Sequence, residues 1–125
     1  MRSSLAALST IGFLAAFLAQ AVAHHGWSWT EDGFFELEGT IAEIYVGNPH
    51  ATLDIDVEAE VWRVDLAPPS RTIAAGFEEG TASVGDTITA IGHRSLDQNE
   101  RRMKAVRIIV DGNTYDVYPG RVPSN

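Results

Sequence analysis

The chain of 125 residues contains no cysteine. Disulfide cross-links, thiolate metal sites and thiol catalysis are therefore excluded, and a metal ion would have to be bound by nitrogen and oxygen ligands. Basic residues are also scarce, because nine Lys and Arg stand against 17 Asp and Glu, for a formal net charge of −8. Nucleic acid and anionic lipid both rely on cationic contacts, so neither is expected as a partner.

Charged residues are missing from the run between Leu5 and Val22, which follows the basic Arg2. The run ends in Ala21-Val22-Ala23, and this order is typical of a secretory signal peptide cleaved after Ala23. A retained anchor is the alternative, since roughly 18 to 20 apolar residues span a bilayer. We expect residues 1–23 to be removed and residues 24–125 to form a single exported domain, periplasmic or secreted, with no stable membrane insertion after cleavage.

Short segments of alternating apolar and polar residues predict strands, which are expected at 37–46, 51–57, 61–66, 87–91, 105–110 and 114–118. The alternation slips at Ala42-Glu43, which predicts a bulge in the first strand. Between the third and fourth strands, Ser70 is expected to cap a short helix that ends at Gly76. The tail from Pro119 is expected to be loose.

This strand pattern predicts an all-β, mainly antiparallel fold. The expected architecture is a small five- or six-stranded barrel of the oligonucleotide/oligosaccharide-binding type with one short helix, and a two-sheet sandwich is the alternative. The apolar strand faces predict a core made of Leu37, Ile41, Leu53, Ile55, Trp62, Val64, Leu66, Ile88, Val106 and Ile108.

Cleavage after Ala23 would give the chain a new terminus that begins His24-His25. The freed α-amine and two imidazoles suit copper, nickel and zinc, of which copper(II) has the highest intrinsic affinity. Neither histidine is third from this terminus, so the square tripeptide chelate is not encoded. A brace of the His24 amine and ring with a remote histidine is the arrangement that we expect, and a disordered terminus is the alternative.

Two more histidines are candidates for the remote ligand. His50 follows Pro49, whose fixed φ stiffens the turn and gives His50 a defined direction. By alternation His50 shares the polar face of its strand, so an ordinary surface histidine is the alternative. His93 is the weaker candidate, because the neighbouring Arg94 disfavours a second cation.

The aromatic residues Trp27, Trp29 and Tyr45 support a different function, in which the domain binds a small molecule, an envelope polymer or a protein partner without metal. For the two tryptophans, anchoring of the amino-terminal segment to the barrel is favoured over a platform on which a ligand stacks. Serine-hydrolase, zinc-protease and phosphate-loop motifs are absent from the sequence, so an enzyme is not expected. The leading prediction is a non-enzymatic metal-binding protein with copper as its ion.

Several motifs resemble those of a family of small exported bacterial proteins classed as a domain of unknown function. The motifs are His24-His25, Leu37-x-Gly39-Thr40-Ile41, Asn48-Pro49-His50-Ala51, Trp62-x-Val64, Val84-Gly85-Asp86 and Asp111-Gly112. The resemblance implies export, a bacterial origin and a single domain, and it supplies no reaction. The sequence departs from the family where Gly26-Trp27 follows the histidine pair and where Val46-Gly47 precedes Asn48.

Intact-mass analysis of the protein recovered from the cell envelope should give a chain that begins at His24, because Ala21-Val22-Ala23 offers the small residues that signal peptidase needs. A chain that keeps the apolar run, or one cleaved several residues away, would lack the free amine beside His24 and would exclude the brace.

Overall fold

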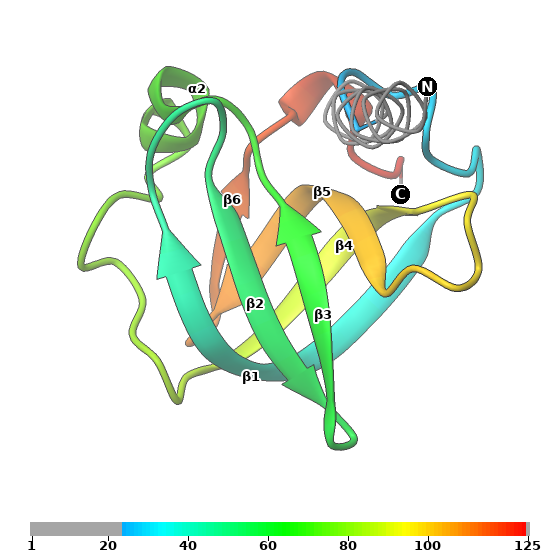
Figure 1. Ribbon diagram of the computed structural model, residues 1–125. Helices are drawn as coiled ribbons and strands as arrows, with labels where there is room; N and C mark the ends of the chain where they lie inside the picture. Colours follow the sequence, from blue (N-terminus) through cyan, green and yellow to red (C-terminus); the bar gives the residue numbers. More distant parts are fainter. Residues whose placement is uncertain (1–23, 125) are drawn as a thin grey trace, which may run out of the picture.

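The structure, a computed structural model, describes residues 24–124, so the predicted signal peptide lies outside the described residues. Its elements are β1 (Phe35–Tyr45), β2 (Thr52–Val57), β3 (Glu60–Asp65), α2 (Pro69–Ala74), β4 (Thr87–Arg94), β5 (Arg102–Val110), β6 (Asn113–Asp116) and the 3-10 helix η1 (Pro119–Arg121) (Figure 1). None of the helices within these residues is long and apolar enough to cross a membrane.

The strands form one sheet in the order β3-β2-β1-β4-β5-β6, and a parallel pairing of β3 with β5 closes five of them into a barrel. The opening residues of β5, Arg102 to Lys104, pair with β3, whereas its later residues pair with β6. The predicted barrel with one short helix is therefore confirmed, and the sandwich is not what forms.

The first strand, β1, is long because it pairs with a different strand along each of its two parts. Its first part pairs with β4 and its second part pairs with β2, and the register with β2 shifts between Ile41 and Glu43. The bulge predicted at Ala42-Glu43 is thus confirmed, and it bends the strand around the core. A side chain at Gly39 would collide with the Asp56 carbonyl, so glycine permits the close approach of β2 at this bend.

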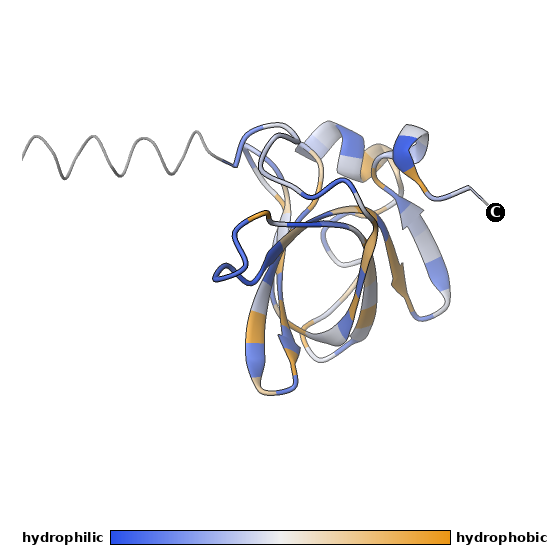
Figure 2. Ribbon diagram, turned by 90° about the vertical axis from the view of Figure 1, so that its right-hand side faces the viewer, coloured by the Kyte–Doolittle hydropathy of each residue, from blue (hydrophilic) through white to orange (hydrophobic). Residues whose placement is uncertain are grey.

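The interior of the barrel is apolar, and each of the ten residues predicted for the core is buried. Figure 2 shows apolar and polar stretches that alternate along the strands, as expected when one strand face is buried. The sequence pattern missed Phe77, which is fully buried and follows Gly76 at a φ of +95°. Phe77 lies outside any strand, so alternation gave no signal for it.

Three local expectations need correction. The short helix begins at Pro69 and no side chain caps it, because Pro68 occupies the N-cap position and Ser70 lies inside the first turn. The fourth strand runs on to Arg94 and the fifth begins at Arg102, since the two pair across this stretch. The segment after β6 contains η1, and it was wrongly expected to be wholly loose.

Replacement of Trp62 by alanine should lower the free energy of unfolding by about 3 to 5 kcal/mol, as large-to-small changes in a core do. Trp62 is buried, and its ring lies 5.5 Å from that of Phe35 at an interplanar angle of 30°. Urea unfolding followed by circular dichroism measures the change. Val61→Ala is the matched control, because the neighbouring Val61 is 55% exposed. A similar small loss in both variants would contradict the assigned strand face.

Candidate functional site

One end of the barrel carries a cleft of about 250 Å³ where the amino-terminal segment crosses the ends of several elements. Its lining residues are His24, His25, Gly26, Trp27, Pro49, His50, Asp65, Leu66, Pro68, Lys104 and Tyr118. Three of the four predicted metal ligands thus line the same cleft, although the histidine pair and His50 lie far apart in the sequence.

Trp29 anchors the amino-terminal segment to the barrel. Its side chain is buried, and its indole N–H donates to the Gly26 carbonyl over 3.1 Å. The backbone continues this attachment, because the Leu96 N–H donates to the Trp29 carbonyl and Thr30 forms a bridge with Ser95. Trp29 therefore anchors the amino-terminal segment, which is one of the two roles predicted for the tryptophans.

Trp27 is held by cations and by the carboxyl-terminal segment. The Lys104 Nζ lies 4.5 Å and the Arg121 Cζ 4.2 Å from the centre of the Trp27 ring, and the Tyr118 ring packs edge-on at 4.9 Å. Lys104 also donates to the Gly26 carbonyl over 2.7 Å. Burial lowers the pKa of the Lys104 ammonium, an effect that Asp65 opposes and Arg121 strengthens. These contacts fix the segment that carries His24 and His25.

His50 enters the cleft from the loop between β1 and β2. Its Nε2 atom is buried and has no hydrogen-bond partner among the described residues. The nearest carboxylate oxygen is Asp65 Oδ2 at 3.6 Å, which is an ion-pair distance and too long for a hydrogen bond. Two donors at about 2.1 Å from one tetrahedral ion lie about 3.4 Å apart. His50 and Asp65 are therefore separated about as two ligands of one tetrahedral ion would be.

Asp65 is the main residue of the cleft that was not selected from the sequence, because alternation along β3 puts it on the same face as exposed Arg63. It is 1% exposed, because β3 pairs with β5 at this point and Arg102 covers its carboxylate. The sequence held one signal, which is that Asp65 is the single charged residue between Arg63 and Arg71. An isolated acid in an uncharged run is one that needs a specific partner if it is buried.

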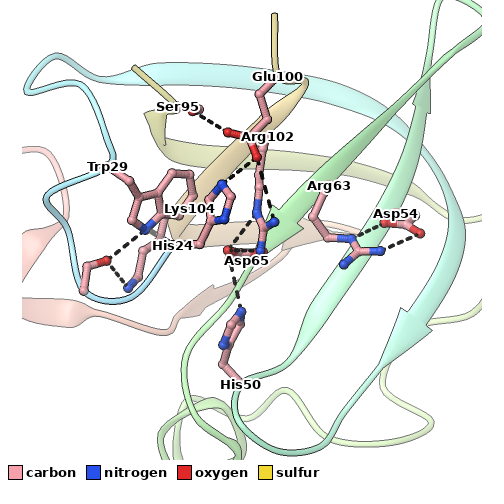
Figure 3. A network of polar contacts seen from close by, with 11 residues as sticks. His24, Trp29, His50, Asp54, Arg63, Asp65, Ser95, Glu100, Arg102 and Lys104 are labelled. Carbon is pink, nitrogen blue, oxygen red and sulfur yellow. Dashed lines mark hydrogen bonds and ion pairs between the residues drawn. The ribbon is translucent and has the colours of Figure 1, made fainter. Parts of the chain in front are cut away.

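A chain of polar contacts joins the two sides of the cleft (Figure 3). Arg102 donates to both oxygens of Asp65 over 3.0 to 3.1 Å, and its Nη1 lies 3.9 Å from Glu100 Oε1. The same Glu100 oxygen lies 2.5 Å from His24 Nε2. The Ser95 hydroxyl donates to the other Glu100 oxygen over 2.8 Å. His24 and His50 therefore stand at opposite ends of one network.

Two predicted residues do not line this cleft. His93 is buried with its Nδ1 3.0 Å from the Gly33 carbonyl, and its ring contacts Phe34 and packs edge-on against Trp27 at a centroid distance of 5.7 Å. Tyr45 is exposed, and its hydroxyl donates to the Asn48 carbonyl in a separate hollow. The structure therefore does not bring Trp27, Trp29 and Tyr45 together into one aromatic surface.

The candidate metal-binding groups of the cleft lie in two places. His50 and Asp65 form a pair, and His24 and His25 lie nearby on the amino-terminal segment. Within residues 24–124 no group of three or more His, Asp or Glu side chains is already gathered as a metal site. His24 points to Glu100, whereas His50 points to Asp65. Binding of one ion by both sides would require the amino-terminal histidines to turn further into the cleft that they already line.

In a comparison with protein families, the model of a family of unknown function (DUF6152) matches residues 12–104. The chain belongs to this family. The DUF6152 match includes the histidine pair, the loop of His50, and both Asp65 and Arg102. No curated protein matches the chain. A functional assignment for this DUF6152 protein therefore rests on the geometry of its cleft.

Replacement of Lys104 by methionine should loosen the amino-terminal segment, because both the bond to Gly26 and the cation–π contact with Trp27 are lost. We expect amide exchange of Thr30, whose N–H donates to the Trp27 carbonyl, to report a local opening free energy lower by about 1 to 2 kcal/mol. Arg107→Met on the same strand is the control, since Arg107 pairs with Asp116 outside the cleft. Unchanged exchange in the Lys104 variant would show that the segment is held by other contacts.

Proposed function

We propose that the exported and processed chain is a non-enzymatic metal-binding protein whose cleft takes a transition-metal ion, with copper(II) preferred. The proposal is carried by one observation, namely the buried and partnerless Nε2 of His50 beside Asp65 in a cleft that His24 and His25 also line. Buried polar atoms nearly always have a partner, so an orphaned imidazole nitrogen indicates a ligand that completes it.

His50 and Asp65 supply one half of the proposed site. Imidazole nitrogen and carboxylate oxygen are both ligands for divalent first-row metals, and affinity for such donors rises towards copper. The bidentate contact with Arg102 keeps the Asp65 carboxylate in a defined orientation. The ion would therefore meet a rigid pair of donors.

His24 supplies the other half once the chain is processed. Glu100 contacts its Nε2, so the second ring nitrogen, Nδ1, is the one that can chelate an ion together with the α-amine of the same residue. Metal-binding histidines commonly donate their other ring N–H to a carboxylate, which sets the tautomer and the orientation of the ring. His25, which is exposed, adds a third imidazole at the mouth of the cleft.

The charge of the molecule favours cation capture. Without Arg2 the chain has eight basic residues against 17 acidic ones, and such an excess raises the local concentration of cations around the protein. Near the cleft, Asp65 and Glu100 place negative charge beside His50 and His24, whereas the positive charges of Lys104 and Arg121 lie against the Trp27 ring. The family match begins at residue 12, so it includes part of the apolar run together with most of the domain.

Calorimetry of the chain that begins at His24 tests the proposal directly. His50→Ala should weaken copper(II) binding by at least about tenfold, which is 1.4 kcal/mol. One extra residue before His24 should weaken it similarly by blocking the amine. If both changes act on one site, the double variant should lose less than the sum of the two effects. Affinity should also fall as the pH is lowered, because imidazole must lose its proton to bind.

His93→Gln is the matched control, since it removes a histidine that lies outside the cleft. If the chain binds copper only weakly and His50→Ala leaves the affinity unchanged, the histidine pair acts as a simple chelating tail. That outcome would favour the alternative function, in which the cleft lined by Trp27 and Tyr118 binds a small molecule, an envelope polymer or a protein partner without a metal.

A further inference from the structure

We infer that Arg102 is a positioning residue that couples His24 on one side of the cleft to His50 on the other, although it does not line the cleft itself. His24 and His50 are called the two histidine arms below. The inference rests on the proposed metal site, and it adds that His24 and His50 are oriented by one shared guanidinium. Binding at one arm would then depend on the same side chain as binding at the other.

The contact of Arg102 with Asp65 is the stronger of its two ion pairs. Its Nε and Nη2 atoms donate to the two carboxylate oxygens over 3.0 to 3.1 Å, and the Asp65 side chain is 2% exposed. Bidentate pairs of this kind hold a carboxylate in both position and plane. Asp65 Oδ2, which faces His50, is therefore placed by Arg102.

The contact with Glu100 reaches the other arm. Arg102 Nη1 lies 3.9 Å from the Oε1 atom that also contacts His24 Nε2, and Ser95 holds the second oxygen of the same carboxylate. Glu100 thus sits between a fixed cation and a fixed hydroxyl, with His24 as its third neighbour. A shift of the guanidinium would therefore move the Glu100 carboxylate relative to the His24 ring.

Trp29 gives Arg102 a third point of attachment. The Arg102 Cζ lies 5.6 Å from the centre of the Trp29 ring, and His24 packs edge-on against the same ring with a centroid distance of 5.0 Å. One guanidinium therefore contacts the end of β3, the loop before β5 and the amino-terminal segment. Figure 3 shows Arg102 in contact with the Asp65 and Glu100 carboxylates, with His50 beside the first and His24 beside the second.

Arg102→Lys is the first test variant, because it keeps the positive charge beside buried Asp65 and so favours folding. A lysine ammonium is a point charge and does not reproduce the planar fork that serves two carboxylates. Arg102→Gln is the second variant, and dispersed amide spectra confirm that each variant is folded. Arg101→Lys and Arg101→Gln are matched controls, since neighbouring Arg101 makes the same kind of bidentate pair with exposed Glu60.

The first measurement needs no metal. Nitrogen-15 NMR of the imidazoles reports which ring nitrogen carries the proton. In the parent we expect Nε2 of His24 to carry it against Glu100, and Nε2 of His50 to carry it because of the negative charge of Asp65 at 3.6 Å, without a hydrogen bond. Arg102→Lys should mix the tautomers of both rings, whereas the Arg101 controls should leave both unchanged. The second measurement is copper(II) calorimetry, in which the Arg102 variants should bind about 10- to 100-fold more weakly, as is usual for residues that orient metal ligands.

Changes in both rings, together with weaker copper binding, would support the coupling. A response of His50 alone, or of neither ring, would overturn it, because Arg102 would then serve Asp65 or the fold only. If the parent binds copper weakly while both rings still respond to Arg102→Lys, the coupling is supported and the proposed metal binding is overturned. The two proposals can therefore fail separately.

Discussion

The parallel pairing of β3 with β5 is the contact on which the rest of the molecule depends. It closes the sheet into a barrel and removes the open edges that these two strands would otherwise present. The pairing aligns Asp65 with Lys104 and Arg63 with Arg102. It therefore also places the Asp65 carboxylate beside the basic residues that begin β5. The buried carboxylate, its guanidinium and the ammonium that holds Gly26 all follow from this single register.

The barrel could be predicted because its signals are local. Alternation in β2 and the slip at Ala42 are visible within a few residues, and they identified both the core positions and the bulge. The environment of Asp65 could not be predicted in this way, since β3 and β5 are separated by α2 and β4 along the chain. Alternation describes one strand and its two faces, and it contains no information about the strand that closes a barrel.

The histidines that line the cleft could be selected from the sequence, whereas the charged residues around them could not. Paired histidines after an apolar run and a histidine after proline are distinctive residue types in a sequence with four histidines, so His24, His25 and His50 could be selected. Glu100 and Arg102 lie in a charged stretch that reads as an ordinary polar hairpin tip. Their role depends on where the amino-terminal segment docks, which is a property of the folded chain.

Lys104 is the single lysine in the chain, and it is 9% exposed with its ammonium against Trp27 and Gly26. Removal of the apolar run would therefore leave His24 with the one readily accessible primary amine on the molecule. Amine-reactive reagents would modify this terminus selectively under mild conditions, so a label could be attached at the mouth of the cleft without any engineered residue. The burial that holds the amino-terminal segment thus also makes its first residue chemically addressable.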